Sequence, residues 1–361
     1  MSSVHFSRIT ACLGAIALIA TLCTADRSGT ERPVLVNGEA LRIGLAFGGT
    51  LTWMPRDQLA TTLDDAVTLG ARWIRADLSW AEIQPESPTA FHWERFDRVA
   101  AATRQRGLTL LPIITYTPAW ARPHDCTSEK CAPADPRQFA KFAGEAAGRY
   151  RGIATWEIWN EENSELFWEP TPDALAYGEL LEATTVSIRA SNPSAQVIIG
   201  GLANTGGIPP RAYLVDLVAT GATREVDGLG IHPYTYPDLA STNGPWDGPG
   251  GNSATNPQSL RSVFAEAGMP ELPLWITEFG APTGGRDVTD HVSEARQAEL
   301  VEDGLQTSAR DDAIASFIWY SYQDTGSAPE DPESHYGLVR TDGSKKPAYE
   351  AFRRTAAGPH R

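Results

Sequence analysis

Short apolar runs alternate with longer segments that carry an apolar stripe at helical spacing along most of this chain. Eight such runs are rich in β-branched and aromatic residues, which favours strands. They are Ile43–Phe47, Trp73–Asp77, Leu108–Thr115, Ile153–Asn160, Gln196–Gly201, Val226–His232, Leu274–Phe279 and Ala313–Tyr320. A segment with helical periodicity follows each run: 57–70, 94–106, 136–151, one starting at Thr171–Pro172, 209–220, 257–268, 290–309 and 347–356.

The apolar runs lack the strict two-residue alternation of strands that have one face in water. Continuous apolar runs followed by helices are typical of parallel strands buried on both faces. The eight repeats predict a single (β/α)₈ TIM barrel over residues 41–357. An open doubly wound sheet is the alternative, but no G-x-G-x-x-G motif follows the first strand.

Two long loops follow predicted strands at the face where barrel enzymes hold their chemistry. The first, 238–256, is rich in Gly, Pro, Ser and Asn, and the second is 321–337. Several aromatic residues lie near strand ends or in loops on this face, where they could stack on a ligand or pack in the core. They are Trp80, Tyr116, Trp120, Trp159, Trp168 and Trp246.

Residues 1–25 are predicted to form a secretory signal peptide. Arg8 precedes an apolar run, Ile9–Cys23, that contains no Asp, Glu, Lys or Arg and is too short to span a bilayer. A lipoprotein anchor at Cys23 is the alternative, although Leu22 is bulky where a small residue is expected. We therefore expect an extracytoplasmic protein, secreted or held at the cell wall, with a linker at 26–40.

Removing the signal peptide leaves two of the four cysteines, Cys126 and Cys131. In an exported protein, two such close cysteines most simply form one disulfide that closes a short loop. A structural zinc site needs about four ligands, and only His124 lies nearby, so we expect no metal.

The composition narrows the classes of partner. Hydrophobic residues make up 42% of the chain, too many for a disordered protein. The net charge of -15, without a basic cluster, argues against nucleic-acid binding, which needs clustered Lys and Arg. No apolar stretch reaches transmembrane length. The 11 Trp residues fit a sugar-binding cleft, since indole faces pack on sugar rings.

Two glutamates end predicted strands in similar positions. Glu161 follows the fourth strand in W-E-I-W-N-E, and Glu278 ends the seventh in W-I-T-E-F-G. From strands three apart in a closed barrel, they can face each other across its mouth. Two opposed carboxyl groups are what the cleavage of a glycosidic bond requires, one as acid and one as nucleophile or stabilising charge.

These motifs resemble clan A of the glycoside hydrolases, the retaining (β/α)₈ enzymes, and most closely its families 39 and 5, with their β-xylosidases and cellulases. The resemblance covers the whole predicted barrel. It implies a secreted O-glycosyl hydrolase that needs no cofactor, acts as a monomer and cleaves β-linked polysaccharide or oligosaccharide. A furanosidase acting on galactofuranose or arabinofuranose, and a barrel that binds polysaccharide without cleaving it, remain as alternatives.

Matched by position, the resemblance assigns roles to seven residues. Glu161 corresponds to the acid/base, Glu278 to the nucleophile and Asn160 to the residue that holds the sugar 2-hydroxyl. The other four correspond to substrate-site residues near the nucleophile or under the sugar: Arg75, His232, Tyr234 and Trp319.

The sequence also departs from the family patterns. The strand-three segment Thr115–Trp120 lacks the His that family 5 usually carries, and Glu162 stands where Pro is frequent after the acid/base. Glu162 could therefore be mistaken for the acid. Glu157 lies further back in its strand, which predicts a structural role.

Overall fold

The computed structural model describes residues 35–36, 39–204, 206–242 and 259–358. The predicted signal peptide, most of the predicted linker, and Trp246 with most of its loop lie outside these residues. Two short antiparallel strands, β1 (Leu35–Val36) and β2 (Glu39–Ala40), precede the barrel, in a segment predicted to be a linker.

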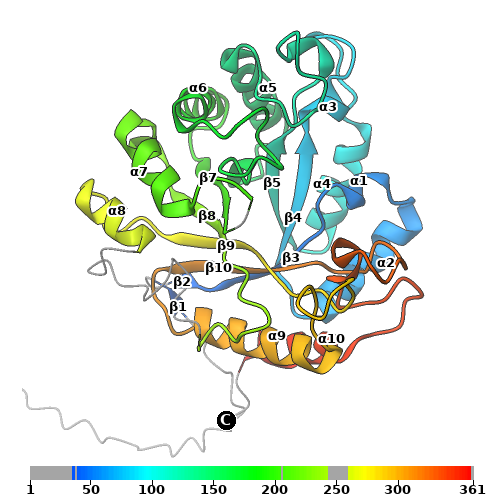
Figure 1. Ribbon diagram of the computed structural model, residues 1–361. Coiled ribbons are helices and arrows are strands. Elements are labelled where there is room, and N and C mark those ends of the chain that lie inside the picture. The colour runs from blue at the N-terminus through cyan, green and yellow to red at the C-terminus, as the bar shows by residue number, and fades with distance from the viewer. Residues whose placement is uncertain (1–34, 37–38, 205, 243–258, 359–361) are drawn as a thin grey trace, which may run out of the picture. The chain divides into compact units, whose positions relative to one another are not determined.

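Eight parallel strands form a closed barrel in the order β10-β3-β4-β5-β6-β7-β8-β9, which confirms the predicted TIM barrel (Figure 1). The strands are β3 (Arg42–Ala46), β4 (Trp73–Ser79), β5 (Thr109–Thr115), β6 (Thr155–Asn160), β7 (Gln196–Ala203), β8 (Gly228–His232), β9 (Leu274–Phe279) and β10 (Ile314–Tyr320). Because the sheet closes on itself, the carboxyl ends of all eight strands meet at one mouth.

Each barrel strand is followed by a helix, and Figure 1 shows these helices on the outside of the strands. They are α2 (Arg56–Thr68), α4 (Glu94–Gln105), α5 (Pro136–Arg149), α6 (Ala174–Ser191), α7 (Pro210–Thr220), α8 (Leu260–Glu266), α9 (Glu294–Ser308) and α10 (Pro347–Ala356). Short helical turns add α1 (Thr50–Trp53), α3 (Trp80–Ile83), η1 (Ala119–Ala121), η2 (Ala222–Glu225) and η3 (Pro332–His335).

The start of α6 differs from the prediction. Thr171 and Pro172 are the predicted cap and first helical residue, but Asp173 caps the helix instead. Its carboxylate accepts hydrogen bonds from the backbone N–H groups of Leu175 and Ala176, at 2.9 and 3.0 Å. An Asp side chain satisfies these free N–H groups as well as a Thr side chain does, and Asp173 lies directly before the first helical residue, so Asp173 is the N-cap.

The two faces of each barrel strand carry different chemistry, as β4 shows. Ile74, Ala76 and Leu78 point outward and are fully buried in the core beneath the helices. Arg75 and Asp77 point inward and line a cavity at the barrel mouth. This alternation follows from the two-residue period of a strand, and it places Arg75 and Asp77 on the interior face of β4.

Below the mouth, the barrel interior is filled by an apolar cluster of Ala46, Leu111, Ile198, Trp275, Ala315 and Ile318. Outside the strands, several aromatic rings pack edge to face or stacked between β-strands and helices. They include Trp80, Trp93, Phe139, Phe142, Trp159, Trp168 and Tyr177. The interior is therefore a packed core, and the mouth is the part of the barrel open to a ligand.

None of the helices in the described part of the chain has the length and apolar content needed to cross a bilayer.

Candidate active site

A cavity of about 1170 Å³ lies at the carboxyl ends of the barrel strands. Residues from the ends of most of the strands, and from the loops that follow them, line it. The lining includes Gly49, Arg75, Asp77, Tyr116, Asn160, Glu161, Tyr234, Glu278, Tyr320, Glu333 and Tyr336. A cavity at this face is the expected place for chemistry in a barrel of this kind.

The two predicted glutamates face each other in this cavity. Glu161 lies directly after β6 and Glu278 lies on β9, and their side chains are 14% and 13% exposed. One carboxylate oxygen of each, together with a ring nitrogen of His232, lies within 4.8 Å of the other two atoms. This spacing is close to that of a carboxyl pair that acts by covalent catalysis, and shorter than the separation that leaves room for an intervening water.

The surroundings of Glu278 favour its ionised form. Arg75 Nη1 donates a short hydrogen bond to Glu278 Oε1, and the Tyr234 hydroxyl donates one to Oε2 at 2.8 Å. Burial by itself raises the pKa of Glu278, but the charges of His232 and Arg75 and these two hydrogen bonds outweigh it. The pKa of Glu278 is therefore below its usual value, as a carboxylate nucleophile requires.

Arg75 is held by a second, fully buried glutamate. Its Nε and Nη2 donate to Glu157 Oε2 and Oε1 at 2.6 and 3.1 Å, and Nη2 also donates to Asn160 Oδ1 at 2.9 Å. Thr277 donates a further hydrogen bond to Glu157 at 2.9 Å. This arrangement confirms the structural role predicted for Glu157, because its charge fixes the guanidinium that contacts Glu278.

His232 links the two sides of the carboxylate pair. Its Nδ1 lies 2.8 Å from Glu161 Oε1 and 3.7 Å from Glu278 Oε2, while its Nε2 lies 3.1 Å from the Thr277 hydroxyl. The ring is fully buried and fits only because Gly201 on β7 has no side chain. A Cβ atom at position 201 would lie 2.0 Å from His232 Nε2.

The backbone at the end of β6, around Glu161, adopts an unusual conformation. Trp159 and Glu161 have positive φ angles of 69° and 49°, which non-glycine residues rarely adopt. Two contacts hold this turn: the Glu161 N–H donates to the Gly201 carbonyl at 3.1 Å, and the Trp159 indole N–H donates to the Phe167 carbonyl at 2.8 Å. The turn directs the Glu161 side chain across the barrel mouth toward Glu278.

Residues 34–324 match the family model of cellulase, glycosyl hydrolase family 5. The chain belongs to glycosyl hydrolase family 5. It is therefore a glycoside hydrolase of clan A, which confirms the predicted recognition, fold and enzyme class. No curated protein matches its sequence.

Several solved structures share the fold of this family 5 hydrolase. A family 39 glycoside hydrolase from the gut symbiont Bacteroides cellulosilyticus WH2 has 24% identity and a TM-score of 0.71, over 91% of this chain and 64% of that one. A monomeric beta-xylosidase from Caulobacter crescentus CB15 has 19% identity and a TM-score of 0.62, over 87% and 67%. A family 5 enzyme from Streptomyces cattleya, in complex with Manβ1-4GlcNAc, has 19% identity and a TM-score of 0.64, over 88% and 80%. The chain spans just under two thirds of the first of these.

The structure of the family 5 hydrolase places one predicted site residue, Trp319, outside the cavity. Trp319 is expected under the bound sugar, but it is fully buried and packs against Phe279 in the core outside the strands. Its neighbour Tyr320 lines the cavity instead. Consecutive residues of a strand point to opposite faces, so only one of the two can reach the mouth.

Most of the aromatic residues predicted near the mouth also belong to the core. Trp80, Trp159 and Trp168 are fully buried, and of the described candidates only Tyr116 lines the cavity. Its φ angle of 66° is the third positive value among the described non-glycine residues, after those of Trp159 and Glu161. The cavity also contains an aromatic residue that was not predicted, Trp53, which is 60% exposed.

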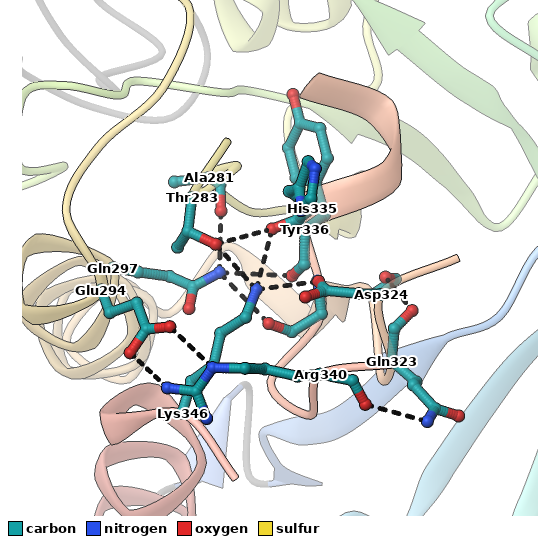
Figure 2. A network of polar contacts seen from close by, with 12 residues as sticks. Ala281, Thr283, Glu294, Gln297, Gln323, Asp324, His335, Tyr336, Arg340 and Lys346 are labelled. Atoms are coloured by element: carbon teal, nitrogen blue, oxygen red, sulfur yellow. Dashed lines mark hydrogen bonds and ion pairs between the residues drawn. The ribbon is translucent and has the colours of Figure 1, made fainter. Parts of the chain in front are cut away.

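The loop after β10 lines the cavity, as predicted, and a buried ion pair anchors it (Figure 2). Lys346 Nζ donates to Asp324 Oδ1 and to the Thr283 hydroxyl, both at 2.8 Å, and to the His335 carbonyl at 3.0 Å. The Gly337 N–H donates to the same oxygen of Asp324 at 2.8 Å. These contacts hold in place the segment whose residues Glu333 and Tyr336 line the cavity.

Cys126 and Cys131 form a disulfide, which confirms that prediction. It lies between η1 and α5, and Cys131 makes a short bridge with Glu169 in the loop after β6. The Thr117 hydroxyl donates to the Cys131 carbonyl at 2.6 Å. The bridge between Cys131 and Glu169 therefore joins the disulfide-closed loop after β5 to the loop that follows Glu161.

Proposed function

We propose that this glycoside hydrolase is a secreted retaining enzyme that cleaves β-O-glycosidic bonds in polysaccharide or oligosaccharide by double displacement. The observation that carries the proposal is the pair of facing carboxylates, Glu161 and Glu278, with oxygens within 4.8 Å in one cavity. The names of the similar structures also point to saccharide substrates, although they name different sugars.

In the first step, Glu278 attacks the anomeric carbon and the bond from this carbon to the leaving oxygen breaks. Glu161 gives its proton to that oxygen, so the leaving sugar departs as a neutral alcohol. The product is an ester between Glu278 and the glycon. Arg75 and Tyr234 orient the attacking carboxylate, since both contact it directly.

In the second step, the ionised Glu161 takes a proton from water, and the water oxygen attacks the anomeric carbon. The ester bond breaks, and Glu278 leaves as a carboxylate that Arg75 and Tyr234 again stabilise. Two inversions at one carbon give net retention. Asn160, held by Arg75 at 2.9 Å and lining the cavity, is placed to contact the 2-hydroxyl group.

Substitution of each carboxylate tests these roles. Glu278→Ala removes the nucleophile and is expected to lower kcat by at least about 10⁴-fold on every substrate. Glu161→Gln is expected to slow aryl glycosides with poor leaving groups by roughly 10²–10⁴-fold, and those with good leaving groups much less. Undiminished turnover by Glu278→Ala would exclude the mechanism.

Glu162→Gln is the matched control, because it makes the same chemical change one residue from the proposed acid. Glu162 is fully buried, does not line the cavity, and packs against Gly200. Burial raises its pKa well above the usual value, which favours its neutral form in the folded protein. Gln resembles a neutral Glu, and we expect this variant to keep wild-type activity.

The stereochemistry gives an independent test. The anomer released first from an aryl β-glycoside, followed by NMR, is expected to be β. Release of the α anomer would establish inversion and exclude a covalent intermediate on Glu278.

The proposed secretion rests on the charge-free apolar run Ile9–Cys23. Expression of the full chain in a bacterial host is expected to give an exported protein whose new N-terminus lies near Asp26. Recovery of the full-length chain from the cytoplasm would contradict this proposal.

A further inference from the structure

Asp77 is a cavity carboxylate that the proposed chemistry does not use. It lies two residues after Arg75 on β4, and therefore points into the barrel mouth on the same face. Its backbone N–H donates to the Gly48 carbonyl at 3.0 Å, which fixes this end of the strand against the loop after β3.

The carboxylate of Asp77 faces open space in the cavity. A Cβ atom on Gly49 would lie 3.7 Å from Asp77 Oδ2, so any larger side chain there would project over the carboxylate. Gly48 has a φ of 52°, a left-handed conformation that glycine adopts without strain. The two glycines therefore leave room above Asp77 for a ligand.

No hydrogen bond to the Asp77 carboxylate comes from any residue in the described ranges. The nearest basic residue along the strand, Arg75, already serves Glu157, Glu278 and Asn160. Burial raises the pKa of Asp77 to about 7, and the negative charges of Glu278, Glu82 and Glu157 add to this effect against the attraction of Arg75. A carboxylate left without a partner at such a place is costly, unless a ligand supplies donors.

Two tyrosines share this part of the cavity with Asp77. Tyr116 and Tyr320 both line it, and the charge of Asp77 contributes, after burial, to the raised pKa of each hydroxyl. A carboxylate beside aromatic rings suits a sugar, whose hydroxyls donate hydrogen bonds while its C–H faces pack on the rings.

We propose that Asp77 accepts hydrogen bonds from the 3- and 4-hydroxyl groups of the sugar that Glu278 attacks, and selects neutral sugars over uronic acids. The assignment rests on the proposed function. The charge of Glu278 acts on Asp77, and Asn160 is placed for the 2-hydroxyl, so the 3- and 4-hydroxyls of the same sugar are the ring hydroxyls left for Asp77. The carboxylate of a uronic acid would be repelled by three acidic residues in the same cavity, Asp77, Glu278 and Glu333.

The test compares Asp77→Asn with wild type on an aryl β-glycoside that the wild type hydrolyses, and on its 3-deoxy and 4-deoxy analogues. On the parent, we expect Asp77→Asn to lower kcat/KM by roughly 10²-fold, because Asn cannot accept two charge-assisted hydrogen bonds. On each deoxy analogue, which lacks one of the two contacted hydroxyls, the two enzymes should differ by only about tenfold. Asp312→Asn, an exposed Asp in the loop before β10, is the control and should match wild type.

Several outcomes would overturn the inference. One is an equal loss for Asp77→Asn on the parent and on both deoxy analogues, and another is no loss on the parent. A third is a wild-type preference for the uronide over the neutral glycoside. Failure of the proposed function is distinguishable from these, since wild type would then cleave none of the glycosides.

Discussion

Asp77→Asn should stabilise the folded protein at neutral and alkaline pH while it impairs the site. The ordinary pKa of Asp is 3.8, and in the folded state burial raises that of Asp77 to about 7. Between these values the folded state keeps a proton that the unfolded state has released. Wild-type stability from this group is therefore complete below pH 4 and is lost as the pH rises through 7.

The size of the effect follows from the two pKa values. Each pKa unit corresponds to about 1.4 kcal/mol, so the loss between pH 4 and pH 8 is at most about 4 kcal/mol. Water in the cavity screens the carboxylate, and we expect roughly 2 kcal/mol. Asn does not titrate, so the variant escapes this loss.

Urea unfolding of wild type, Asp77→Asn and Asp312→Asn from pH 4 to pH 8 measures the difference. The stability of Asp77→Asn relative to wild type should rise with pH, while that of Asp312→Asn should stay constant. A relative stability of Asp77→Asn that does not change with pH would refute the reasoning, and so would a variant less stable than wild type at pH 8.

Three other perturbations test the supports of the site. Gly201→Ala places a Cβ atom 2.0 Å from His232 Nε2 and should lower kcat by about 10²-fold in a protein that still melts cooperatively; wild-type kcat would contradict this. Asp324→Ala leaves the 2%-exposed Lys346 charge without its partner and should cost about 3–5 kcal/mol in urea unfolding. Cys131→Ser opens a short disulfide loop and should lower the free energy of unfolding by about 2 kcal/mol. Under reducing conditions, the variant and the wild type should be equally stable.

The periodicity of the sequence was enough to place the barrel elements. Runs such as Leu274–Phe279 are apolar on both faces, and this pattern fits only a strand covered by helices on one side and by the barrel interior on the other. Because parallel strands in a closed barrel share one carboxyl end, the positions of Glu161 and Glu278 along their strands implied that they meet.

The choice between adjacent aromatic residues could not be made from the sequence. Trp319 and Tyr320 are both large and apolar, and either could occupy the mouth. The pairing of β10 with β3 aligns Tyr320 with Ala46, and this register turns Tyr320 inward and Trp319 into the core.

Asp77 shows the same division within one strand. Its sequence neighbours mark it as the end of a strand, but its value as a binding group depends on space left by Gly49 and on charges from other strands. The sequence by itself determined the order of strands and helices and the strand ends that bear the acids, because periodicity and residue type are local properties. Only the tertiary structure decided which side chains reach the cavity and which carboxylates stay charged, because strand register, burial and neighbouring charges arise when distant segments pack together.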